Sequence, residues 1–294
     1  MAYSSIDSVF VRQYADTYVA LLEQKESRLL STVTNIGEVT GNTFTVNEMG
    51  TLGDSFSAMG PSYQAFGDTA YTDLSVASRL ATMSDFPNFT RLAIQDLYKL
   101  KADPQDKLLQ RLQAKWNRKV DSVVYNALIG NAGRKENGGE VWTQVTLPAT
   151  QVLGDVDTAP TKQLLIDIRT KFLANECDEE IYITYNAALL NAILADPTLT
   201  SADYLAGQML QKGEISNFLG FNWVHYEGIK STDGLSATGV AYTKSAVEVG
   251  INSISPLKIV EVEAQNRFHS IGHIEAIGAV RTSEKAVVAF KFKI

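Results

Sequence analysis

The clearest pattern in the chain is a series of apolar residues spaced three and four positions apart between Asp103 and Gly130. This spacing places the apolar side chains along one face of an α-helix. They are Leu108, Leu109, Leu112, Trp116, Val120, Val123, Val124, Ala127 and Leu128. Asp103 can cap the helix, Pro104 fits its first position and Gly130 fits its end. A helix of about 26 residues is roughly 39 Å long, so it needs a broad apolar surface to cover its stripe.

A second periodic pattern covers residues 4–33 and predicts an amphipathic helix. Its apolar positions keep a period of about 3.6 residues. They are Val9, Phe10, Tyr14, Tyr18, Leu21, Leu22 and Leu29. No other helical pattern lies close to it in sequence, so we expect it to pack against a distant part of the chain or against a neighbouring subunit.

Residues 36–90 are polar and rich in Gly, Ser and Thr. Alternating patterns predict strands over 43–46 and 72–77, separated by turn-forming Gly and Pro. A two-stranded arm with no core of its own is marginally stable in water. Because long irregular loops are uncommon in compact domains, we expect a projecting arm that is buried against another copy of the chain. An ordinary long surface loop is the alternative.

The remaining patterns predict two further regions. After the long helix, residues 131–140 predict a polar turn and residues 141–159 predict short extended pieces. From 160 to 255, helical and extended patterns alternate, as in a compact α/β domain. The predicted helices cover 161–174, 185–194 and 204–211, and the predicted strands cover 180–184, 221–226 and 240–249.

Short extended segments at the C-terminus can supply the sheet that the long helix requires. They cover 257–262, 267–275, 278–282 and 287–292. Because the helix precedes the α/β block and these strands follow it, the sequence predicts a discontinuous domain into which the α/β domain is inserted.

Composition and charge exclude several classes of protein. The 294 residues are 45% hydrophobic and 20% charged, which is typical of a globular chain. The formal net charge of −7 argues against a surface devoted to nucleic acid. The first residues lack the basic start of a secretory signal, and the single Cys177 cannot form an internal disulfide. No apolar run of about 18 residues predicts a membrane span.

Residues with catalytic or metal-binding chemistry form no recognisable constellation. The chain has no GxGxxG, GxxxxGKS/T or GxSxG motif. His269 and His273 lie on a predicted strand, where four residues span ~13 Å, too far to share a metal. His225 lies in another predicted strand, and the acidic neighbours of Cys177 disfavour a reactive thiolate. We therefore predict no catalytic, cofactor-binding or metal-binding residues.

A row of basic residues follows the long helix on the side away from its apolar stripe. This basic row consists of Lys107, Arg111, Lys115 and Arg118. One interpretation is an ordinary solvated face. The other is a surface that meets acidic groups of a neighbouring subunit, or a polyanion. We predict that the basic row is an inter-subunit contact.

Two stretches of sequence carry a family resemblance in addition to the order of the elements. The stretch around the long helix carries Asp103-Pro104, the pair Arg118 and Asp121, and Gly130-Asn131-Ala132. The later stretch carries Leu194-Ala195-Asp196, Gly213-Glu214-Ile215 and Gly220-Phe221. With these features the chain resembles the major capsid proteins of tailed bacteriophages, which have the Hong Kong 97-type fold.

The resemblance implies an α+β fold of the Hong Kong 97 type, in which an α/β domain is inserted into a second domain. The implied parts are an N-terminal arm over 1–35, an extended β-arm (E-loop) over 36–90, a P domain over 91–159 with a spine helix over 104–129, an A domain over 160–255, and C-terminal P-domain strands over 256–294.

The implied function is structural rather than enzymatic. Subunits would assemble as hexamers and pentamers into an icosahedral shell that encloses double-stranded DNA without sequence-specific contacts. Free arms agree with this, because neighbouring subunits would bury them. Assembly would take place in the host bacterial cytoplasm, and the protein would end in the virion, with no membrane partner.

The resemblance also implies partners and leaves alternatives. Because only about 35 residues precede the arm, too few for a cleaved scaffolding-like segment, we expect a separate scaffolding protein or none. A portal is a further expected partner, and a decoration protein is left open. The alternatives are the shell protein of an encapsulin-like cellular compartment and, from another class, an α/β enzyme with a carboxylate site that carries no motif.

Overall fold

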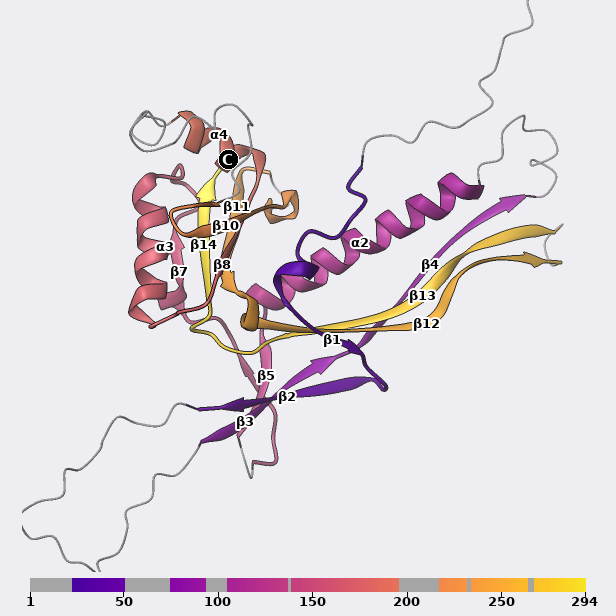
Figure 1. The fold of residues 1–294 in the computed structure, drawn as a ribbon, viewed down its shortest axis with the longest axis horizontal. Helices are drawn as coiled ribbons and strands as arrows, with labels where there is room; N and C mark the ends of the chain where they lie inside the picture. Colours follow the sequence, from indigo (N-terminus) through magenta and orange to yellow (C-terminus); the bar gives the residue numbers. More distant parts are fainter. Residues whose placement is uncertain are drawn as a thin grey trace, which may run out of the picture. The chain divides into compact units, whose positions relative to one another are not determined.

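The computed structural model describes residues 23–50, 75–93, 105–136, 139–195, 217–231, 234–263 and 267–294 (Figure 1). Pro104, the helix predicted over 204–211 and the part of the N-terminal helix before residue 23 lie outside these ranges. The chain divides into two compact units, each built from separate segments. Unit 1 comprises Met1–Ser27, Asp85–Lys119 and Ser253–Ala276, and unit 2 comprises Arg28–Ser84, Val120–Asn252 and Ile277–Ile294.

The predicted long helix is present as α2, Gln105–Ile129, which contributes residues to both units. Buried positions of its apolar stripe are Leu112, Trp116, Val120, Val124 and Leu128. In unit 1, the Trp116 ring contacts His273 of β13 (Phe268–Arg281) edge-on, with the ring centroids 5.9 Å apart. It also lies 6.3 Å from the Phe86 ring of β4 (Ser84–Ala93). The predicted contact between the stripe and a C-terminal strand is confirmed, and Figure 1 shows α2 alongside β4 and β13.

Strands β4 and β13 belong to a four-stranded sheet with the order β1-β12-β13-β4. β1 (Thr34–Glu38) pairs in parallel with β12 (Val247–Val262). In unit 1, the buried Asn88 of β4 donates from Nδ2 to the Leu112 carbonyl of α2 at 2.9 Å. Gly272 allows β4 to approach β13, because a Cβ there would lie 2.3 Å from the Asn88 carbonyl oxygen.

A six-stranded sheet in unit 2 has the order β7-β14-β11-β8-β10-β9. Its strands are β7 (Val152–Gly154), β8 (Ile181–Tyr185), β9 (Asn217–Phe218), β10 (Phe221–His225), β11 (Ser236–Thr243) and β14 (Val287–Lys293). β8 and β10 run parallel, whereas β11 is antiparallel to β8 and β14. The helices predicted over 161–174 and 185–194 are confirmed as α3 (Lys162–Ala174) and α4 (Ala187–Ala195).

The C-terminal strands divide between two sheets, which corrects the expectation that they supply one sheet for the long helix. β14 pairs with β11 and β7 in the six-stranded sheet. Its residues 287–290 are buried in succession, which is typical of an interior strand covered on both faces. The segments predicted separately over 267–275 and 278–282 form the single strand β13, because the buried Ala276 and Ile277 continue it.

The third sheet, also in unit 2, has the order β2-β3-β5-β6. Its strands are β2 (Thr43–Met49), β3 (Val76–Thr82), β5 (Ala132–Glu136) and β6 (Thr143–Val145). The strand predicted over 43–46 is confirmed within β2, and the strand predicted over 72–77 is described from Val76 onward. The predicted turn over 131–140 is wrong over 132–136, because antiparallel pairing with both β3 and β6 holds this polar segment as β5.

The N-terminal helix predicted over 4–33 is wrong over residues 23–33. Here the chain forms no α-helix, and the short 3-10 turn η2 (Leu30–Thr32) leads directly into β1. The backbone N–H groups of Arg28 and Leu29 each donate to Asp121 Oδ1 at 3.0 Å, so they are not used in helical hydrogen bonds. Leu29 is fully buried within unit 2, so packing in that unit accounts for its apolar character.

Short 3-10 turns connect further strands of unit 2. They are η3 (Ala149–Gln151), η4 (Glu227–Ile229) and η5 (Lys244–Ala246). Across the described residues, no helix has the combination of length and apolar character that a membrane crossing requires.

Candidate functional site

The basic row lies on the part of α2 that belongs to unit 1. With 3.6 residues per turn, its members fall together on one side of the helix, turned away from the side that carries the buried Leu112 and Trp116. Lys115 is exposed, and the other three side chains are partly exposed. The predicted geometry of one continuous basic face is therefore present, whereas its role in contacting another subunit stays a prediction.

Glu23 places its carboxylate between two arginines of the basic row. Glu23 Oε2 accepts a hydrogen bond from Arg118 Nη1 at 2.8 Å, and Glu23 Oε1 lies 3.8 Å from Arg111 Nη1. The hydrogen bond from Arg118 holds the pKa of the Glu23 carboxyl below its ordinary value, against the opposing effect of burial and with help from the Arg111 charge. A carboxylate of the same chain therefore neutralises part of the row.

The two lysines of the row have a different environment. Lys107 and Lys115 form no ion pair with any residue in the described part of the chain. These two ammonium groups are therefore the members of the row that stay available for an acidic group from outside the described residues.

Residues 23–27, which we call the strap, are held to α2 by a second polar contact. Asn117 Nδ2 donates to the Lys25 carbonyl at 2.7 Å. Glu23 and Asn117 were not predicted as site residues, because Glu23 and Arg118 are 95 positions apart and no local pattern connects them. Glu23 lies within the helix predicted over 4–33, where an acidic residue is expected on the polar face, so nothing in the sequence indicated that it contacts the basic row.

From residue 28 onward the chain is anchored within unit 2. Asp121, which is fully buried, accepts hydrogen bonds from the backbone of Arg28 and Leu29. The Arg28 guanidinium donates to the His225 carbonyl at 2.9 Å and also contacts His225 Nδ1. The Thr32 and Tyr242 hydroxyls are hydrogen-bonded at 2.6 Å. Asp121 is one of the residues that carry the family resemblance. In unit 2 it anchors the chain that follows the strap.

A second charged cluster lies at the base of the β2–β3 hairpin, in unit 2. Arg79 of β3 donates to Glu48 of β2 at 2.8 Å and makes two hydrogen bonds to Glu284, at 2.5 and 2.8 Å. The Arg79 side chain is 1% exposed, and Glu48 also meets Arg134 of β5 at 3.2 Å. Burial lowers the pKa of Arg79, but the two carboxylates outweigh it and raise the net value above the ordinary one.

Arg281 connects this cluster to the C-terminal end of α2, because its Nε lies 3.6 Å from Glu284 Oε1 and its other nitrogens reach the helix end. Its Nη1 donates to the carbonyls of Leu128 at 3.0 Å and Gly130 at 2.6 Å, and its Nη2 donates to the Val145 carbonyl of β6 at 3.1 Å. The guanidinium thus satisfies carbonyls that the helix end leaves unpaired. Burial lowers the pKa of this guanidinium. We call Glu48, Arg79, Arg281 and Glu284 the hairpin-root cluster.

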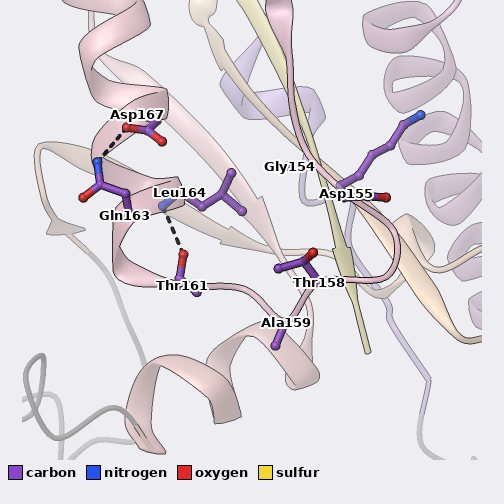
Figure 2. Close-up of a pocket in the computed structure, with 9 residues that line it drawn as sticks. Gly154, Asp155, Thr158, Ala159, Thr161, Gln163, Leu164 and Asp167 are labelled. Atoms are coloured by element: carbon purple, nitrogen blue, oxygen red, sulfur yellow. Dashed lines mark hydrogen bonds between the residues drawn. The ribbon is translucent and has the colours of Figure 1, made fainter.

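A pocket of about 190 Å³ lies at the N-terminal end of α3 (Figure 2). It is lined by Gly154, Asp155, Thr158, Ala159, Thr161, Gln163, Leu164, Asp167 and Lys291. Figure 2 shows two local hydrogen bonds, from Gln163 to Asp167 at 2.8 Å and from the Leu164 N–H to the Thr161 hydroxyl at 3.4 Å. The second of these caps α3, so polar groups of the lining serve the helix terminus.

The histidines lie on strands, as predicted. His225 is on β10, whereas His269 and His273 are on β13. In unit 1, the buried His273 lies 2.9 Å from Asn88 Nδ2 and 3.2 Å from a Glu275 carboxylate oxygen, so its ring nitrogens have neighbours within the fold. Within the described ranges, no group of three or more His, Cys, Asp or Glu is placed to hold a metal ion.

Solved structures of phage capsids share this fold over nearly the whole chain. The match to a protein of Mycobacterium phage Che8 has a TM-score of 0.70 at 15% identity and covers 98% of each chain. The capsid of cyanophage P-SCSP1u matches with a TM-score of 0.68 at 13% identity, covering 98% of this chain and 94% of that one. The capsid of Ralstonia phage GP4 also gives 0.68, at 9% identity, covering 100% and 97%.

Comparison of sequences gives the family. No curated protein matches the chain. The family model described as "Phage capsid protein" matches residues 6–294, which is almost the entire length. The chain therefore belongs to the phage capsid protein family, and it is a major capsid protein with the fold of tailed-bacteriophage capsids.

Proposed function

We propose that this capsid protein assembles as hexamers and pentamers into a closed icosahedral shell around double-stranded DNA. The observation that carries the proposal is the extent of the match: the family covers residues 6–294, and capsid structures are covered almost completely by the chain. Its role in the virion is structural, and we infer that it has no catalytic site. The net charge of −7 argues against a surface devoted to binding nucleic acid, and the shell would enclose DNA without sequence-specific contacts.

We propose that the parts of the subunit follow the Hong Kong 97 plan. Residues 1–35 would be the N-terminal arm, 36–90 the extended β-arm, 91–159 and 256–294 the P domain, and 160–255 the A domain. The hairpin-root cluster supports the role of the β-arm, because buried ion pairs between β3, β2 and residue 284 fix the base from which that arm extends.

We propose that the basic row contacts a neighbouring subunit. Lys107 and Lys115 carry this proposal, because they have no ion pair within the described residues while Arg111 and Arg118 share Glu23. A portal and, where one exists, a separate scaffolding protein would be further partners, a decoration protein is left open, and assembly would take place in the host bacterial cytoplasm.

Electron microscopy of the purified protein tests the proposal. We expect sizing chromatography to give a peak of megadalton mass and negative stain to show hollow closed particles. A chain that stays monomeric at high concentration would contradict the shell. Particles filled with a cargo protein in place of DNA would instead support the encapsulin-like alternative.

A shortened β-arm tests the arm separately. Gly50 and Ser75 are joined by a backbone hydrogen bond at 2.8 Å at the end of the β2–β3 pairing. Replacing residues 51–74 with Asn-Gly would close the hairpin at this point with a favoured two-residue turn. We expect a folded subunit that forms no shells, and shells at normal yield would contradict the proposed role of the arm.

A further inference from the structure

The strap and the residues that follow it are fastened in different ways. Residues 23–27 are held to α2 in unit 1 by the Glu23 ion pairs and by the Asn117 hydrogen bond. Residues 28–33 are held in unit 2 by the buried Asp121 and by side chains such as Leu29 and Val33, which are almost fully buried. The boundary between the two compact units falls between Ser27 and Arg28.

Exposure decides which of these fastenings is weak. The Glu23 side chain is 18% exposed, and its partners Arg111 and Arg118 are 38% and 40% exposed. Ion pairs at this degree of exposure contribute little to stability and are screened by salt. Hydrogen bonds to a buried carboxylate such as Asp121 are stronger, because removing them leaves an uncompensated buried charge.

The strap also occupies part of the basic row. While Glu23 is docked, it meets Arg111 and Arg118, and Lys107 and Lys115 are the members without an ion pair in the described part of the chain. If Glu23 leaves, the same face presents four positive charges spaced three and four positions apart. The docked strap and an acidic group from a neighbour therefore compete for the same two arginines.

We propose that residues 23–27 are a releasable electrostatic strap that controls how much of the basic row is open to an acidic surface of a second copy of this chain. The proposal rests on the proposed inter-subunit role of the row. Release opens the arginines while Asp121 and the packing of Leu29 keep the following chain in place. A change in ionic conditions, or a neighbour's carboxylate, thus exchanges one partner of the row for another without unfolding either unit.

Hydrogen exchange of the full-length unassembled subunit, followed by mass spectrometry, tests the release. The variant Glu23→Gln removes the charge that pairs with the row, and Glu26→Gln is the matched control because Glu26 is exposed and has no ion pair with the row. We expect Glu23→Gln to speed exchange over residues 24–27 severalfold and to leave residues 29–33 unchanged. We expect Glu26→Gln to behave like the unaltered chain.

A charge exchange provides a second, stricter measurement. We expect Glu23→Lys to open the strap further than Glu23→Gln, and the added change Arg118→Glu to restore part of the protection by re-creating the pair in reverse. Equal exchange in Glu23→Gln and the unaltered chain would overturn the strap. So would joint opening of residues 24–33, because the strap would then not be a separate element.

Particle formation is measured in a separate experiment. A wrong proposal about the strap can therefore be told apart from a wrong proposal about the shell. If the row is an inter-subunit contact controlled by the strap, Glu23→Gln shifts the protein concentration at which particles form, and Glu26→Gln does not. A released strap with an unchanged assembly threshold would overturn the control of the row. Absence of particles from the unaltered chain would contradict the proposed function, while the exchange measurement would still report on the strap.

Discussion

The hairpin-root cluster and the strap use the same chemistry at very different degrees of burial. In the hairpin root, Arg79 is 1% exposed and holds two carboxylates through three hydrogen bonds. In the strap, Glu23 holds two arginines whose side chains are more than a third exposed. Each cluster joins segments that are far apart in sequence, and the carboxylates of both are partly buried, but only the first removes its arginine from water.

This difference indicates what each cluster can do. A buried charge pair whose partner is lost leaves a charge that cannot reach water, so the hairpin root tolerates almost no opening. An exposed pair that opens is hydrated at little cost, so the strap can detach. Under the proposed function, the first arrangement would fix the base of the β-arm, whereas the second would provide a contact that is exchanged during assembly.

The largest effect is expected from breaking the hairpin root. Glu284→Gln removes the carboxylate that accepts two hydrogen bonds from Arg79 and lies 3.6 Å from Arg281 Nε, so two buried guanidinium groups lose a charged partner. We expect the free energy of unfolding to fall by about 3–5 kcal/mol, as measured by urea denaturation of the subunit. The control is Glu261→Gln, which breaks an exposed pair with Arg267 and should change stability by less than about 1 kcal/mol. Similar values for the two variants would contradict the comparison.

A smaller effect is expected from the anchor that follows the strap. Asp121→Asn keeps the shape of a fully buried side chain but removes the charge that accepts hydrogen bonds from Arg28 and Leu29. We expect a loss of about 1–3 kcal/mol and faster hydrogen exchange over residues 28–33. Unchanged exchange there would show that apolar packing alone fixes this segment.

Glu227 is as exposed as the strap arginines but has several hydrogen-bond partners, and pH measures its contribution. It is partly exposed, but its carboxylate accepts from the Ala187 N–H at 2.7 Å and pairs with Lys230 at 2.7 Å. Burial raises its pKa, but Lys230, the Ala187 N–H and His225 outweigh this effect and lower the pKa to about 2. Its stabilisation is therefore complete above the ordinary value of 4.5 and is lost as the pH falls toward about 2.

Urea denaturation across that acidic range tests this sign. We expect Glu227→Gln to lose less stability than the unaltered chain between pH 5 and about 2, because the variant has no carboxyl to protonate at this position. Parallel pH curves for the two proteins would show that the carboxylate gains nothing from its partners.

The smallest effect on stability is expected within the basic row. Arg118 lies 2.8 Å from Glu23, whereas Arg111 lies 3.8 Å from it. We expect Arg118→Gln and Arg111→Gln each to change the free energy of unfolding by less than about 1 kcal/mol. Hydrogen exchange over residues 24–27 should nevertheless rise more in Arg118→Gln, and raising the salt from about 0.05 M to about 0.5 M should reduce that difference. An equal effect of the two substitutions would show that distance from Glu23 does not decide the contact.

The sequence by itself determined the elements whose signals are local. The stripe of α2, the face of α3 and the strands β8 and β10 follow from local patterns, because apolar residues recur at a fixed interval in a helix and form a short run in a buried strand. The strand predicted over 240–249 is wrong over 244–246, because the 3-10 turn η5 divides it between β11 and β12. The order of these elements and two short stretches also determined the resemblance to phage capsid proteins, which the match over residues 6–294 confirms.

Only the tertiary structure decided which segments become partners. β5 is polar, and pairing with β3 and β6 makes it a strand. The sequence pattern of β14 resembles that of the other C-terminal strands, but β14 is buried in the six-stranded sheet. The bond from Arg118 to Glu23 and the pair of Arg79 with Glu284 span 95 and 205 positions. A local pattern carries no information about such pairs, because their energy depends on how far folding has removed the charges from water.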